Sequence, residues 1–107
     1  MTVPLMAVGG HGIISVASNE APAEMVQMVE AAEGNDFPVA RALHARLMPL
    51  MQVNFVESNP IPVKSAMAAM GLLEESYRLP IVPPRAESKQ KIVKTLRDLG
   101  LLKGALV

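Results

Sequence analysis

The feature that most constrains this chain is a single strand-like segment in a sequence that is otherwise helical. Residues 9–19 read GGHGIISVASN, a glycine turn followed by a short apolar run and two residues that favour a helix start. The run Ile13–Val16 is typical of a strand buried on both faces, which needs parallel neighbours at both edges. No other segment offers a convincing strand. The sequence therefore predicts the end of a larger α/β protein.

Helical periodicity accounts for most of the remaining sequence. Residues 2–8 fit the last turns of a helix, which the glycines at 9 and 10 would end. Four further helices are expected, at about residues 20–33, 36–54, 62–70 and 88–99. Their expected N-caps are Ser18 or Asn19 for the first, Asn35 or Asp36 for the second and Ser88 for the last.

Each of these helices carries an apolar stripe on one face. Pro49 falls within the second helix, where a proline should kink or interrupt it. The stripes comprise Ala21, Met25, Met28, Val29 and Ala32, then Phe37, Ala40, Leu43, Leu47, Leu50, Met51 and Asn54, and finally Ile92, Leu96 and Leu99.

Length and composition limit the core that these helices can build. The chain has 107 residues, enough for one small domain. It has only three aromatic residues and eight methionines, and methionine fills space without specifying tight packing. We therefore expect a soft core that another surface completes.

Charge and residue usage exclude several classes of function. Ten basic residues balance ten acidic ones, so no basic surface for nucleic acid is expected. Cysteine is absent, which rules out disulfides and thiolate metal sites. The N-terminus lacks the pattern of a signal peptide, and no apolar run approaches the ~20 residues that span a membrane. The cytoplasm is the expected compartment.

Chemical motifs in the chain are few. The glycines of GGHG precede the strand, whereas phosphate-binding loops place them between strand and helix. The only histidines, His11 and His44, lack further ligands at metal-binding spacing. Ser15 lies outside a nucleophile elbow. Five lysines, at 64, 89, 91, 94 and 103, all lie in the helical tail, so none is on the strand.

The order of elements suggests a particular architecture. In a (β/α)8 barrel, strands and helices alternate until the barrel closes, and residues at the carboxyl ends of the strands line the active site. One strand–helix unit followed only by helices matches a closing unit, residues 1–34, and a three-helix extension, residues 35–107. In that arrangement, Ser15–Asn19 would line the substrate pocket.

The run GGHGIISVASN, together with NFVESNPIPVK and the closing LRDLGLL, resembles the C-terminal part of the dihydrodipicolinate synthase and N-acetylneuraminate lyase family. The resemblance covers essentially the whole chain and is closer to the synthase branch. It implies a pyruvate-dependent class I aldolase on a (β/α)8 (TIM) barrel. The intact enzyme would condense pyruvate, held as a lysine Schiff base, with aspartate semialdehyde in lysine biosynthesis.

The resemblance carries over only a few site residues. Ile14 matches the residue whose main-chain carbonyl borders the pyruvate pocket, and Ser15 and Asn19 match its rim. Val8 matches a contact at the weaker subunit interface of tetrameric members. The Schiff-base lysine and the other catalytic residues lie upstream, so this chain alone is expected to be inactive, and no cofactor or metal is implied.

Three alternatives stay open at this point. A sibling aldolase or lyase of the same superfamily would use another aldehyde, and its specificity residues would also lie upstream. A truncated gene would instead leave a non-catalytic helical module that associates with the missing N-terminal portion, with a full-length paralogue or with further copies of itself. The last alternative is a decayed gene product without function.

Overall fold

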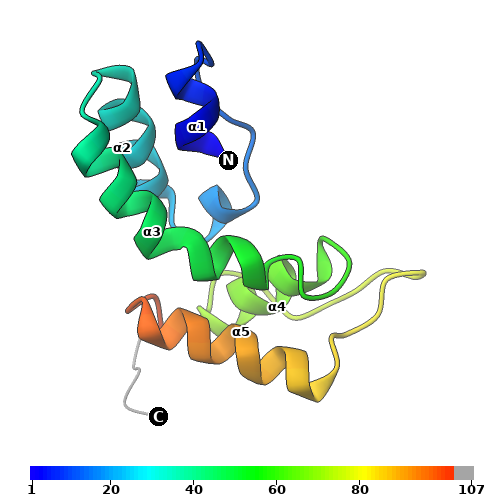
Figure 1. Cartoon of the computed structure of the whole chain (residues 1–107). Coiled ribbons are helices and arrows are strands. Elements are labelled where there is room, and N and C mark those ends of the chain that lie inside the picture. The colour runs from blue at the N-terminus through cyan, green and yellow to red at the C-terminus, as the bar shows by residue number, and fades with distance from the viewer. Residues whose placement is uncertain (103–107) are drawn as a thin grey trace.

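The computed structural model describes residues 1–102 and shows a bundle of helices of about 40 × 34 × 21 Å. Figure 1 shows α1 beside α2 and α3 at one end, with α4 and α5 at the other. The elements follow the sequence as α1 Thr2–Ala7, the short 3₁₀ helix η1 Ala17–Asn19, α2 Pro22–Glu33, α3 Phe37–Val53, α4 Ile61–Ala69 and α5 Ala86–Asp98.

The expected strand does not form. Residues 11–16 run as an extended segment between α1 and η1, and residues 1–102 contain no strand. A strand needs a neighbour to complete its backbone hydrogen bonds, and the described part of the chain provides none at either edge. The prediction of a strand over Ile13–Val16 is therefore wrong for this chain by itself.

The first helix ends where the glycines predict. Gly9 has a φ of +110° and donates its N–H to the Met6 carbonyl, and Gly10 donates to the Leu5 carbonyl at 2.9 Å. A side chain at Gly10 would lie 2.9 Å from that carbonyl oxygen. The two glycines thus turn the chain sharply from α1 into the extended segment.

The central part of the fold is the antiparallel pair of α2 and α3, joined by residues 34–36. Asp36 caps α3, accepting a hydrogen bond from the Val39 N–H at 3.3 Å, as predicted. Both apolar stripes face inward, and the core combines them with residues from α1 and α5. The buried side chains include Met6, Met25, Met28, Ala32, Ala40, Leu47, Leu50, Ile92 and Leu96.

Pro49 does not interrupt α3, so that half of the expectation is wrong. The helix continues through it to Val53. Pro49 is exposed, so solvent reaches the backbone on the side where the helical hydrogen bond is missing.

Two predicted N-caps are also wrong. α2 begins after Ala21 without a side-chain cap, because Ser18 and Asn19 bond back to the preceding residues instead. α5 begins at Ala86, two residues before the expected cap Ser88, and Arg85 takes the N-cap position. The carboxylate of Glu57, 28 residues away, accepts the Arg85 N–H at 3.0 Å and takes the place of a local cap.

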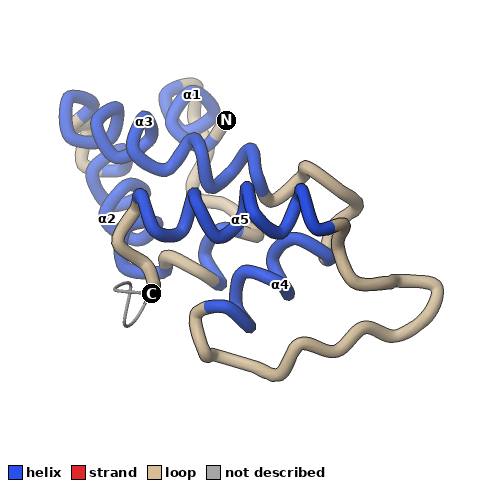
Figure 2. The backbone as a smooth tube through the Cα atoms, turned by 90° about the horizontal axis from the view of Figure 1, so that it is seen from below, coloured by secondary structure: helices blue, strands red, loops and turns tan. Residues whose placement is uncertain are grey.

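α4 and α5 form the other end of the bundle. α5 packs on both α3 and α4, and a long connection without helix, residues 71–85, leads from α4 to α5. Figure 2 shows this connection reaching well away from the helices. No helix within residues 1–102 is long and apolar enough to cross a membrane.

Candidate functional site

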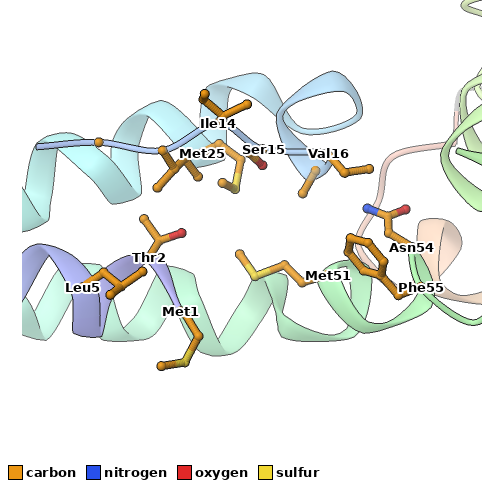
Figure 3. A pocket seen from close by; sticks show the side chains of 13 residues that line it. Met1, Thr2, Leu5, Ile14, Ser15, Val16, Met25, Met51, Asn54 and Phe55 are labelled. Atoms are coloured by element: carbon orange, nitrogen blue, oxygen red, sulfur yellow. The ribbon is translucent and has the colours of Figure 1, made fainter. Parts of the chain in front are cut away.

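A cavity of about 490 Å³ opens between the extended segment, α1, α2 and the end of α3. Figure 3 shows Ile14, Ser15 and Val16 along one side of it, facing Met51 and the residues that follow α3. The lining offers the hydroxyls of Thr2 and Ser15, the amide of Asn54 and backbone groups, but no side-chain amine, imidazole or carboxylate. Such a lining can bind and orient a ligand, whereas covalent or proton-transfer chemistry would need further groups.

The extended segment has open edges. Within residues 1–102, the N–H groups of residues 12–16 have no backbone hydrogen-bond partner. Ile14 is fully exposed and Ile13 is 36% exposed, although both are large and apolar. Exposed β-branched side chains on an unpaired backbone are features of a strand that lacks its neighbours.

A compact turn follows the segment. The Ser18 hydroxyl donates to the Ser15 carbonyl at 2.7 Å, and the Ser18 N–H donates to the Ser15 hydroxyl at 3.1 Å. The Asn19 side chain donates to the Val16 carbonyl at 3.0 Å. Because short polar side chains close such turns locally, this sequence holds the rim of the cavity in place without help from another element.

A buried polar pair lies directly behind this turn. Asn54, at the end of α3, donates from Nδ2 to Oε2 of Glu20 at 2.8 Å. Glu20 is 2% exposed and Asn54 is fully buried. Burial raises the pKa of Glu20 to about 7, and the hydrogen bond from Asn54 offsets only part of that effect.

The predicted site residues separate into two groups. Ile14 and Ser15 lie together in the cavity lining. Asn19 lies outside the lining, with its amide turned back to the Val16 carbonyl. Val8 is 83% exposed at the end of α1, apart from the cavity.

The histidines and lysines lie elsewhere. His11 is exposed, and His44 lines an apolar groove between α1 and α3, where its Nδ1 is buried without a partner. Lys89, Lys91 and Lys94 each form an ion pair with a neighbouring carboxylate. Lys64 lies 5.4 Å from the centre of the Tyr77 ring, and Lys103 is outside the described residues.

Sequence reasoning missed the pairing of Glu20 with Asn54. It placed Glu20 at the start of the helix predicted at residues 20–33 and Asn54 in an apolar stripe. The available signal was the position of Asn54 in an apolar stripe, because a polar residue among buried apolar ones requires a hydrogen-bond partner. The identity of that partner, 34 residues away, depends on the tertiary fold.

Comparison with known proteins places these features in a family. Residues 1–99 match the dihydrodipicolinate synthetase family. The chain is 51% identical over 107 residues to the 4-hydroxy-tetrahydrodipicolinate synthase of Koribacter versatilis, covering 100% of this chain and 36% of that protein. A second relative, the corresponding synthase of Chlorobium chlorochromatii, is 52% identical over 102 residues, covering 95% of this chain and 34% of that protein.

Comparison with solved structures gives the same family as the sequence matches. The dihydrodipicolinate synthase of Thermotoga maritima matches with a TM-score of 0.92 at 42% identity, over 94% of this chain and 34% of that one. The enzyme of Acinetobacter baumannii, solved in complex with pyruvate, matches with a TM-score of 0.90 at 36% identity, over 94% of this chain and 34% of that one. The structural neighbours are TIM barrels. The chain spans about a third of the length of these relatives.

Proposed function

The chain belongs to the dihydrodipicolinate synthetase family, and from that membership we propose that it forms the C-terminal third of a pyruvate-dependent class I aldolase. Residues 1–34 supply the closing unit of the barrel, with Ile13–Val16 as its last strand once neighbouring strands are present. Residues 35–107 form the helical extension. The observation that carries this proposal is the extended segment 12–16, whose N–H groups have no backbone partner within residues 1–102 and which bears exposed isoleucines.

The proposed reaction is the condensation of pyruvate with aspartate semialdehyde. Pyruvate is held as a Schiff base on a lysine of the missing portion, and the product serves lysine biosynthesis in the cytoplasm. This chain contributes the Ile14 carbonyl and the rim formed by Ser15 and Asn19. Since none of the described lysines lines the cavity, no side-chain amine among residues 1–102 is in position to form the Schiff base.

A trapping experiment tests the proposal. The chain is co-expressed with the N-terminal two thirds of the Koribacter versatilis synthase, and the mixture is treated with pyruvate and borohydride. We expect the two pieces to purify together and to yield one reduced pyruvate adduct, on a lysine of the N-terminal piece. The chain alone should give no adduct.

Two results would contradict the proposal. One is a stable adduct on a lysine of the isolated chain, and the other is failure of the two pieces to associate. An Ile14→Asp chain serves as the matched control, because it places a charge on the exposed edge segment without disturbing a buried side chain.

The alternatives within the same superfamily concern the aldehyde. Because the specificity residues lie upstream of this chain, a panel of aldehydes given to the full-length protein would identify a sibling aldolase or lyase. A complex that forms without trapping pyruvate would instead favour a non-catalytic association module. The open edges of residues 12–16 are the observation that favours association in either case.

A further inference from the structure

The Glu20–Asn54 pair contains two atoms with an unmet requirement. Oε1 of Glu20 and Oδ1 of Asn54 are both buried, and neither has a hydrogen-bond donor. Leaving a buried acceptor without a donor costs about 1–3 kcal/mol for each group. A fully ionised Glu20 therefore leaves two such costs within a single side-chain pair.

One proton would remove both costs. A protonated carboxyl group carries a donor and an acceptor on the same planar group, as does a side-chain amide. Asn54 Nδ2 already donates to one carboxyl oxygen at 2.8 Å. With a proton on Oε1, the carboxyl group has a donor for Oδ1 of Asn54, the other orphaned atom.

The surroundings favour that proton. Burial is the main cause of the raised pKa of Glu20, so the uncharged form is the one that the site stabilises. Ionisable groups on the neighbouring elements are not among the causes of the raised pKa. They are the Met1 amino group before α1, Glu24, Glu30 and Glu33 on α2, Arg41, His44 and Arg46 on α3 and Lys64 on α4.

We propose that Glu20 is held in its protonated form and closes a two-bond acid–amide pair with Asn54, so that a single proton joins the turn after the extended segment to the end of α3. This inference concerns the chain itself and stands apart from the proposed enzymatic function. It identifies a proton-binding site whose occupancy controls the contact between the rim of the cavity and the helical extension.

Because of where the pair lies, the proton on Glu20 affects how firmly the rim of the cavity is held against α3. Glu20 directly follows η1, the turn that carries the Ser15–Ser18 and Asn19–Val16 bonds. Asn54 itself lines the cavity. Loss of the proton leaves an anion buried between these elements with one hydrogen bond, and it therefore loosens the rim against α3.

Carboxyl-carbon NMR titration of the folded chain, labelled with ¹³C at glutamate and ¹⁵N at asparagine, tests the proposal. The Glu20 carboxyl signal, assigned with Glu20→Gln, should titrate near pH 7. The side-chain amide signal of Asn54 should shift with the same midpoint, because its Oδ1 loses its donor in the same step. Glu30, exposed on α2, provides the matched control signal, and Glu30→Gln should leave both titrations unchanged.

Glu20→Gln provides a second measurement. Glutamine presents an amide in place of the carboxylic acid, so both hydrogen bonds persist without a titrating proton, and we expect this variant to fold and the Asn54 amide signal to become independent of pH. Titration of Glu20 near 4.5, an Asn54 signal that does not respond in the wild-type chain, or an unfolded Glu20→Gln variant would each overturn the proposal. A chain without dispersed amide signals would overturn it too, because the pair requires α2 and α3 to be packed.

Discussion

Single residues determine how this chain responds to pH, and Glu20 is the clearest case. Its pKa is about 7 in the folded chain and close to 4.5 when it is exposed, so the folded state binds the proton more tightly. The stabilisation from this proton is complete below about pH 4.5 and is lost as the pH rises through 7. The whole effect corresponds to about 3 kcal/mol.

Urea unfolding between pH 4.5 and 8 measures this effect. We expect the free energy of unfolding of the wild-type chain to fall by about 3 kcal/mol relative to that of Glu20→Gln over this range. The comparison with Glu20→Gln cancels the contributions of the other carboxylates. A constant difference between the two chains would show that Glu20 keeps an ordinary pKa.

Gly10 gives a second prediction at this scale. A Cβ at this position would lie 2.9 Å from the backbone oxygen of Leu5, which cannot move without disturbing α1. We expect Gly10→Ala to destabilise the chain by about 1–3 kcal/mol in urea unfolding. Gly12→Ala, where a Cβ meets nothing within 4 Å, should change stability by less than about 0.5 kcal/mol and serves as the control.

Local sequence signals predicted some of these residue roles and missed others. The Asp36 cap and the glycine stop after α1 were predicted because each depends on a few adjacent residues. The caps assigned to Ser18 and Ser88 are wrong because other hydrogen bonds take their place, a local one for Ser18 and a tertiary one at the start of α5. Ser18 bonds to Ser15, and Glu57 from a distant loop reaches the start of α5.

Among the helices, α5 depends most visibly on a distant group. The Ser88 hydroxyl and Arg85 hold the pKa of Glu57 below its usual range, which shows that the ionised carboxylate is the form that binds the helix start. The contribution of Glu57 is therefore present at neutral pH and is lost as the pH falls through its lowered pKa.

Replacing Glu57 by alanine tests this role. We expect faster amide hydrogen exchange at residues 85–90 in Glu57→Ala, while exchange within α3 stays unchanged, because the Arg85 N–H at the start of α5 loses its acceptor. Glu87→Gln, which removes one exposed ion pair with Lys91, should have little effect on exchange in the same turn. Equal exchange in the two variants would rule out a capping role for Glu57.

The helices were predictable and the strand was not, for a physical reason. A helix closes its hydrogen bonds within its own segment, so the periodic stripes of α2, α3 and α5 fix both the element and its buried face. A strand depends on its neighbours. The pattern of Ile13–Val16 therefore indicates a strand that requires neighbours, and residues 1–102 contain no strand that could pair with it.

At the scale of the whole molecule, a buried helical core is combined with an exposed extended segment, residues 12–16. We expect amide hydrogens of residues 12–16 to exchange rapidly in the isolated chain and to gain protection in the co-expressed complex, because partner strands would supply the missing acceptors. Hydrogen exchange followed by mass spectrometry measures both states. Equal exchange in the chain and the complex would exclude strand pairing at this segment.

Two variants separate folding from association at this scale. Ile14→Asp should weaken association while leaving urea unfolding of the chain nearly unchanged, because Ile14 is fully exposed. Leu50→Ala should cost about 2–5 kcal/mol in unfolding, since Leu50 is fully buried in the core. An Ile14→Asp chain that is destabilised like Leu50→Ala would contradict the division between edge and core.

The long connection between α4 and α5 has a consequence for the integrity of the polypeptide. Residues 71–85 contain no helix, reach away from the bundle and expose Leu72, Leu79 and Val82. Proteases cleave most readily where an exposed backbone can enter their active sites. A single cut here would break the covalent chain while α5 stays bound to α3 and α4 through its buried Ile92 and Leu96, so a nicked molecule would keep its shape and reveal the cut only under denaturing conditions.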